Sequence, residues 1–470
     1  MRAPYRNLVA GLVLSTLLLG AVGARAELFK PETFTLRNGL QVVVIPNHRV
    51  PVVSHMLWYR VGSADEVAGK TGLAHMVEHM MFKGTKTVGP EEFSRIVAAN
   101  GGRDNAFTNT DYTAFFQNVA AGKLELVMRL EADRLANLAL QDKDFQPERQ
   151  VVIEERRMRI ENAPEALLEE QMRAAMFLDS SYHHPVIGWH HDIDDYHLAD
   201  VVAFHQRWYA PNNALLIVSG DITAAQLKPL AEKYYGVIPA RPVPVRLRAP
   251  EPAPVAARSV EVRAEDVHQP AWYRDYLAPS YHAGDVKDAY PLQILADIMG
   301  GGATSRLYRT LVVERKLAAS ASAEYDPDGL GESTFSIATS PNPGVSMEAL
   351  AAAMDEAIKA VAADGVTADE VERAKRRLHT EVVYAKDSYH TGAYVFGEAL
   401  TTGSTVADVE AWPERIAAVT VAEVNAAARR LLRDERSVTG RLLPAKPGEA
   451  TVTLEPGAGS AGGLAGKDLR

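Results

Sequence analysis

The stretch from Thr71 to Thr85 reads TGLAHMVEHMMFKGT and contains His75, Glu78 and His79 in the pattern H-x-x-E-H. Helix positions i and i+4 lie one turn apart on the same face, so these two imidazoles can face one metal ion, with Glu78 beside them. Two histidines at this spacing are often a coincidence. The glutamate between them favours a zinc half-site.

The flanking residues predict where this helix begins and ends. Thr71 is a suitable N-cap, and Gly84 is a suitable stop. A water on zinc becomes a nucleophile near neutral pH, and a carboxylate beside it can take its proton and pass it to a leaving amine. A catalytic zinc keeps three protein ligands and one open position, so a third ligand is expected elsewhere in the chain.

Composition limits the possible chemistry. The 470-residue chain contains no cysteine, so a metal must be held by histidine and carboxylate. A formal net charge of −10, without a basic run, argues against nucleic acid as a partner.

Residues 1–26 resemble a signal peptide. Arg2 and Arg6 form a basic head, an apolar run extends from Leu8 to Val22, and Ala24-Arg25-Ala26 is an A-x-A cleavage site. These features predict an exported protein, periplasmic or secreted, rather than one held by an uncleaved anchor. No later stretch is long and apolar enough to span a membrane.

Local patterns predict the elements around the zinc helix. Alternation about Asn38-Gly39 indicates two or three antiparallel strands between residues 27 and 63. Another pair of strands is expected between 103 and 120, and helices are expected at 90–102, 122–138 and 146–162. An edge strand in 103–120 can bind an extended peptide by strand addition or serve only the fold, and both alternatives stay open.

The chain divides at a proline-rich segment and then repeats its plan. The predicted parts are a signal peptide (1–26), a zinc-binding domain (27–238), a linker (239–258), a homologous domain without zinc ligands (259–446) and a tail (447–470). DVVAFHQRWY with ALLIVSG, from Asp200, matches EVNAAARRLL with SVTGRLL, from Glu423, without a gap, and HQPAWYRDYLAP is similar to VSHMLWYRVGS. We therefore expect an α+β fold of two homologous halves, each a mostly antiparallel sheet covered by helices.

Together these motifs resemble the pitrilysin (insulinase) family of zinc metallopeptidases. The resemblance extends over nearly the whole mature chain and includes Pro211-Asn212-Asn213-Ala214 and the segment 301–308. It implies a third zinc ligand, Glu155, in a V-V-x-E-E-type helix, and a supporting carboxylate, Glu148, two helical turns earlier. It also implies a substrate-facing strand at Asn105, Ala106, Phe107 and Thr108.

The resemblance implies a zinc endopeptidase with one Zn²⁺ per chain and Glu78 as general base. One departure concerns the second half, where family members that complete the site carry an arginine and a tyrosine. Val312 and Ala319 stand at those positions here, and Arg315 and Tyr325 are out of register. We therefore expect a heterodimer with a homologous subunit, with a homodimer or a non-catalytic assembly subunit as alternatives.

The histidine-rich loop SYHHPVIGWHHD, at 181–192, is another concentration of possible ligands. Its His-Pro and Gly-Trp pairs favour a structural loop over a second metal site.

Overall fold

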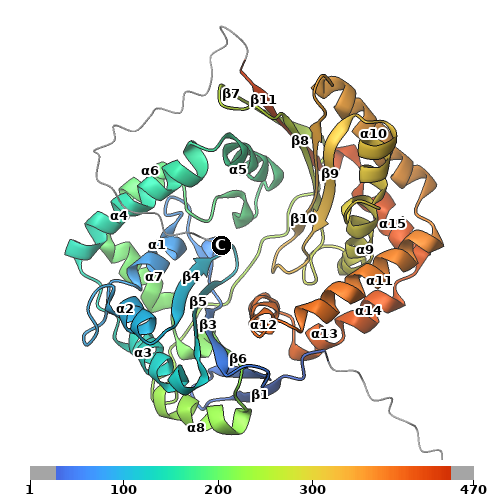
Figure 1. Cartoon of the computed structure of the whole chain (residues 1–470). Helices are drawn as coiled ribbons and strands as arrows, with labels where there is room; N and C mark the ends of the chain where they lie inside the picture. Colours follow the sequence, from blue (N-terminus) through green and yellow to red (C-terminus); the bar gives the residue numbers. More distant parts are fainter. Residues whose placement is uncertain (1–27, 446–470) are drawn as a thin grey trace, which may run out of the picture.

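The computed structural model describes residues 28–445, so the predicted signal peptide and the predicted tail lie outside the described residues (Figure 1). Two sheets with surrounding helices form the two halves of the molecule, and one helix from each half of the chain packs against the sheet of the other half: Pro164–Met176 on the second sheet and Thr391–Thr401 on the first. The α+β fold of two halves is thereby confirmed. In residues 28–445, no helix is long and apolar enough to cross a membrane.

The first half has a six-stranded sheet in the order β1-β2-β6-β3-β5-β4. Its strands are β1 (Glu32–Thr35), β2 (Gln41–Pro46), β3 (Val52–Tyr59), β4 (Arg103–Thr108), β5 (Thr113–Ala120) and β6 (Ala214–Gly220). Neighbours are antiparallel except β2 and β6.

The strands predicted between residues 27 and 63 are present as β1, β2 and β3, and they alternate in direction; β2 and β3 are not neighbours, however, because β6 lies between them. All seven residues of β6 are buried, which explains why this apolar strand takes a central place.

Eight α-helices belong to the described part of the first half. They are α1 (Leu73–Met80), α2 (Glu92–Ala99), α3 (Leu124–Asn137), α4 (Asp142–Arg156), α5 (Pro164–Met176), α6 (His190–Asp195), α7 (Leu198–Trp208) and α8 (Ala224–Tyr234). The helix expected at 90–102 begins later, since Glu91 has a positive φ of 59° and Pro90 precedes it. The helix expected at 146–162 begins earlier, at Asp142, and ends in a π-helical turn, Arg157–Glu161.

The second half has a five-stranded sheet in the order β7-β11-β8-β10-β9. Its strands are β7 (Arg258–Ala264), β8 (Ala271–Ala278), β9 (Ala318–Tyr325), β10 (Ser333–Pro341) and β11 (Ser437–Pro444). Its α-helices are α9 (Ala289–Gly300), α10 (Met347–Asp364), α11 (Ala368–Ala385), α12 (Thr391–Thr401), α13 (Val406–Glu410), α14 (Trp412–Ala418) and α15 (Val421–Leu431).

The structure preserves the internal repeat. Helix α7 and strand β6 begin at Leu198 and Ala214, and their counterparts α15 and β11 begin at Val421 and Ser437, in register with the ungapped match of the sequences. Strands β3 and β8 occupy equivalent places in the two sheets.

The two similar segments that contain Trp-Tyr-Arg, VSHMLWYRVGS in β3 and HQPAWYRDYLAP in β8, are however not structurally equivalent. His55 of β3 pairs with Val218 of β6. The ungapped sequence match aligns Arg441 of β11 with Val218, and Arg441 pairs with Trp272 of β8. Trp272 therefore stands where His55 stands in the first sheet, not where Trp58 stands.

The proline-rich segment contains no helix or strand before β7. It is nevertheless anchored, because the Arg248 guanidinium pairs with Asp65 at 2.8 Å and with Asp111 at 2.6 Å. Arg246 also donates to the Asp111 carbonyl at 2.7 Å. We propose that this segment joins domains 27–238 and 259–446, and its contacts tie it to the loops before α1 and after β4.

Candidate metal centre

Two features hold helix α1 in place: a buried apolar face, and a carboxylate upstream of the helix that accepts hydrogen bonds at its N-terminus. Leu73, Met76, Val77 and Met80 are buried in the core of the first half. Glu66 accepts hydrogen bonds from the backbone N–H groups of Gly72 (2.9 Å) and Ala74 (2.7 Å).

The prediction that Thr71 caps α1 is wrong. Its hydroxyl instead donates to Asp192 at 2.6 Å. The N-cap is Gly72, whose φ of 87° suits glycine, and the helix ends at Met80, before Gly84. Glu66, an acid just upstream of a helix, is the signal that sequence reasoning missed.

Helix α4 brings Glu155 to the histidines of α1. Its Oε2 lies 3.1 Å from His79 Nε2 and 3.8 Å from His75 Nε2. One ligand atom from each residue falls within 4.8 Å of the others. Tetrahedral zinc with bonds of about 2.0–2.2 Å places its ligand atoms roughly 3.4 Å apart, so this donor set fits zinc. In residues 28–445, no other group of His, Cys, Asp or Glu side chains was found to converge this way.

Other side chains hold the ligands in place. Glu148 Oε1 lies 2.8 Å from His79 Nδ1, which leaves Nε2 of that ring toward Glu155. Lys83 pairs with Glu148, and Arg159 Nη1 lies 3.0 Å from Glu155 Oε1. Sequence reasoning missed both cations, although Lys83 follows His79 and Arg159 follows Glu155 by four positions, the spacing at which helical side chains meet.

The electrostatics of the three residues suit a cation. Burial, together with the charge of His79, lowers the pKa of His75 to about 3, so its imidazole is neutral. Burial opposes the charge on His79, but Glu148 and Glu155 outweigh it and raise its pKa to about 9. Burial also opposes the charge on Glu155, yet the two histidines lower its pKa to about 2. A neutral His75 and an ionised Glu155 are in the protonation states that metal ligands need.

Glu78 stands beside this group without belonging to it. Its Oε2 accepts a 2.6 Å hydrogen bond from Thr108 Oγ1. Burial raises the pKa of Glu78, and the Thr108 hydrogen bond partly offsets this. A carboxylate with a raised pKa next to a metal is suited to accept and return a proton.

The strand predicted to face substrate is the edge strand of its sheet. In the described chain β4 pairs only with β5, and it lies against α1. Thr108 points to Glu78, whereas the Phe107 ring packs against Trp58 and Tyr394, with centroids 5.3 and 5.6 Å apart. Asn105 and Ala106 precede them on the strand, and the Ala106 N–H donates to the Asn105 side chain at 2.9 Å.

Arg315 and Tyr325, the residues closest to the positions of the missing arginine and tyrosine, are engaged within the second half. Arg315 pairs with Glu356 at 2.8 Å, and the Tyr325 hydroxyl donates to the Pro279 carbonyl at 2.5 Å. Val312 packs against the core of this half, and Ala319 is exposed.

The loop 181–192 uses its histidines in other contacts. His183 Nδ1 lies 2.8 Å from the Ser180 carbonyl oxygen, and His190 Nδ1 lies 2.9 Å from Glu161 Oε1.

An H-x-x-E-H helix, a converging glutamate from a second helix and a fold of two homologous halves are the features of inverted-motif zinc metallopeptidases. Residues 41–188 match the family described as Insulinase (Peptidase family M16), and residues 196–378 match the Peptidase M16 inactive domain. The chain belongs to the M16 (insulinase) peptidase family.

Two relatives are named as zinc proteases. Zinc protease PqqE of Helicobacter pylori is 31% identical over 443 residues, which are 92% of this chain and 98% of that protein. An uncharacterized zinc protease of Mycobacterium tuberculosis (strain H37Rv), Rv2782c, is 30% identical over 413 residues, 87% of this chain and 92% of its own length.

Solved structures share the fold. A protease from H. pylori superposes with a TM-score of 0.82 at 30% identity, over 88% of this chain and 99% of that one. The periplasmic protease PqqL of Escherichia coli gives a TM-score of 0.75 at 19% identity, over 94% of this chain and 52% of PqqL. The fold of this chain thus corresponds to about half of PqqL.

Proposed function

We propose that this protein is an exported zinc endopeptidase that hydrolyses peptides or small unfolded polypeptides. The observation that carries the proposal is the convergence of His75, His79 and Glu155 at distances suited to zinc, with Glu78 adjacent and free of that group. Among the relatives, the name zinc protease supports the same activity.

Each residue has a defined task in this proposal. His75, His79 and Glu155 would hold one zinc ion per chain, and that ion would supply the Lewis acidity that polarises a peptide carbonyl and acidifies the attacking water. Glu78 accepts the proton of that water and delivers it to the leaving amine, and the Thr108 hydroxyl orients its carboxylate. Glu148 fixes the tautomer and the ring orientation of His79.

The substrate is proposed to bind as an added strand. Strand β4 contacts α1, ends at the Thr108–Glu78 hydrogen bond, and pairs along its outer edge with no strand of the described chain. A peptide paired with this edge would run past Glu78 in an extended conformation, so backbone hydrogen bonds would position the scissile bond.

A homologous partner subunit completes the site in this proposal. Val312 and Ala319 occupy the positions of the arginine and tyrosine, while Arg315 and Tyr325 are engaged elsewhere. PqqL, whose fold is matched over 52% of its length, supports a working unit larger than one such chain. The predicted signal peptide at 1–26 and the periplasmic location of PqqL support a periplasmic site of action.

Hydrolysis of a fluorogenic peptide of about ten residues, by the purified chain with its zinc content assayed, tests this proposal. Turnover dependent on one zinc per chain supports a peptidase that works alone or as a homodimer. One zinc without turnover, and turnover restored by a homologous subunit carrying the arginine and tyrosine, supports the heterodimer. Zinc without turnover in either assay contradicts the peptidase and favours an assembly subunit.

A further inference from the structure

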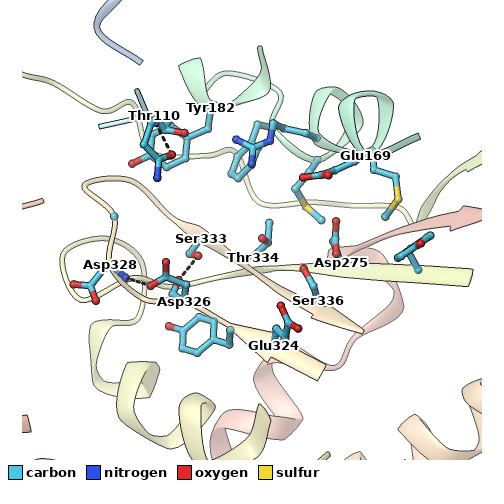
Figure 2. Close-up of a pocket in the computed structure, with 18 of the residues that line it drawn as sticks. Thr110, Glu169, Tyr182, Asp275, Glu324, Asp326, Asp328, Ser333, Thr334 and Ser336 are labelled. Carbon is cyan, nitrogen blue, oxygen red and sulfur yellow. Dashed lines mark hydrogen bonds between the residues drawn. The ribbon is translucent and has the colours of Figure 1, made fainter. Parts of the chain in front are cut away.

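A cavity of about 520 Å³ lies between the two halves of the molecule. Strands β8, β10 and β9 of the second half form one wall, and helix α5 with the loop 109–112 forms the other (Figure 2). Neither wall contains a residue of the candidate metal centre.

The strand register gives the wall of the second half a defined shape. Ser336 of β10 pairs with Asp275 of β8 on one side and with Glu324 of β9 on the other. Thr334 and Ala338 lie two positions away on the same face of β10 and also line the cavity. The result is a trough with small side chains along its centre and a carboxylate on each flank, about 10 Å apart at two strand spacings.

The charge of the lining is one-sided. Eight carboxylates and one guanidinium, that of Arg173, border the cavity. The carboxylates belong to Asp111, Glu165, Glu169, Asp275, Glu324, Asp326, Asp328 and Glu398. Of these, Asp111 is neutralised by Arg248.

One of these carboxylates lacks the hydrogen-bond partner that a buried acid needs. Asp328 Oδ1 is fully buried and, within the described chain, has no hydrogen-bond partner. Burial and the charges of Asp326 and Glu398 raise the pKa of Asp328 to about 8. Burial also raises the pKa of Asp275 to about 6, and a hydrogen bond with Ser336 opposes this shift only in part. A buried carboxylate oxygen without a partner is stabilised by a hydrogen-bond donor. A positively charged donor would also reduce the repulsion between the neighbouring carboxylates.

The cavity lies on the path of a peptide added to β4. Its lining includes residues 109–112, which follow Thr108 directly, and the Thr108 hydroxyl bonds Glu78. An extended chain advances about 3.3 Å per residue, so a side chain roughly two to four residues from the bond beside Glu78 reaches the cavity.

We propose that this cavity is a specificity subsite that accepts a lysine or arginine side chain of the substrate, through Asp275 and Glu324 on the trough and Asp328 at its end. This inference rests on the proposed peptidase function and extends it to a substrate class, peptides with a cationic residue close to the cleaved bond.

The test is a binding measurement that does not require turnover. In the zinc-loaded Glu78→Gln chain, fluorescence anisotropy compares ten-residue labelled peptides in which a single lysine, or a glutamine in its place, is moved along the sequence. At the matching position we expect the lysine peptide to bind about tenfold more tightly than its glutamine counterpart, as for one favourable charged contact.

Variants identify the residues responsible. Asp275→Asn combined with Glu324→Gln should reduce the lysine preference below about twofold, and Glu324→Gln alone, at an exposed position, should reduce it in part. Glu356→Gln, whose side chain is 72% exposed outside the cavity, is the matched control and should keep the full preference. Equal binding of all peptides, or a preference that survives the double variant, would overturn the subsite. Failure of the peptidase proposal would appear separately, as absent hydrolysis by the chain with intact Glu78.

Discussion

His79 Nδ1 and Glu148 Oε1 lie 2.8 Å apart and connect α1 to α4. The contact decides which nitrogen of His79 faces the metal centre, since a proton held on Nδ1 by the carboxylate leaves Nε2 as the donor. Lys83 pairs with the other oxygen of Glu148, so the orienting carboxylate is itself held in place. The geometry of the proposed site therefore depends on residues that do not touch the metal.

Replacing Glu148 with glutamine should weaken zinc binding. The amide can still contact Nδ1 but loses the charge that favours the correct tautomer, so we expect a loss of about 10–100-fold in zinc affinity. Competition with a chromophoric chelator measures this. The control is Glu154→Gln, at a side chain 57% exposed on the same helix, and an equal loss in both variants would contradict the orienting role.

Glu155 and Glu154 are neighbours with different predicted roles. Glu155 Oε2 approaches both histidines, whereas Glu154 pairs with Arg157 on the surface. Glu155→Gln should therefore reduce the zinc content of the purified chain from one per chain to a small fraction, and Glu154→Gln should leave it unchanged. Elemental analysis after dialysis checks this, and the reverse pattern would assign the ligand to Glu154.

Arg248 should contribute strongly to stability. Its side chain is 6% exposed, and those of Asp65 and Asp111 are 2% and 4% exposed. Arg248→Met leaves two buried carboxylates without their cation, which costs about 3–5 kcal/mol. Arg49→Met removes a pair in which both side chains are at least 60% exposed and should cost below about 1 kcal/mol. Urea denaturation compares the two, and similar losses would contradict the anchoring of the linker.

Asp328 predicts a pH dependence of stability. Burial, with Asp326 and Glu398, raises its pKa from 3.8 to about 8. The folded chain then retains a proton that the unfolded chain releases, so the stability linked to Asp328 falls as the pH rises from about 4 to about 8. Asp328→Asn has no such proton.

Melting temperatures at pH 5 and pH 8 test this dependence. The parent chain should lose more stability over this interval than Asp328→Asn, by several degrees. Equal losses in the two proteins would show that Asp328 is ionised in the fold.

Local patterns in the sequence predicted much of the fold. The alternation around Asn38-Gly39 indicated β1 and β2, and the ungapped match between the segments starting at Asp200 and Glu423 predicted the correspondence of α7 and β6 with α15 and β11. The position of β6 between β2 and β3 was not predictable in this way, because the pairing joins residues far apart in the chain. The similarity of the two Trp-Tyr-Arg segments suggested the wrong alignment of β3 with β8, because strand register is determined by pairing with neighbouring strands.

For the candidate site, helical spacing brought His75, Glu78 and His79 together, but the family resemblance was needed to select Glu155 and Glu148. The four-residue spacing could also have predicted that Lys83 and Arg159 lie near the site. The capping of α1 by Glu66 and the anchoring of Arg248 depend on tertiary contacts that leave no periodic signal in the sequence.

The role of Glu78 as general base is the central claim of the proposed function, and the most direct test measures zinc content and peptide turnover together in Glu78→Gln. The assay uses the assembly that shows activity, with the parent chain as reference. We expect one zinc per chain and a loss of turnover of at least about 10²–10⁴-fold, because the water then has no base to take its proton. Loss of zinc, or turnover close to that of the parent chain, would contradict this assignment.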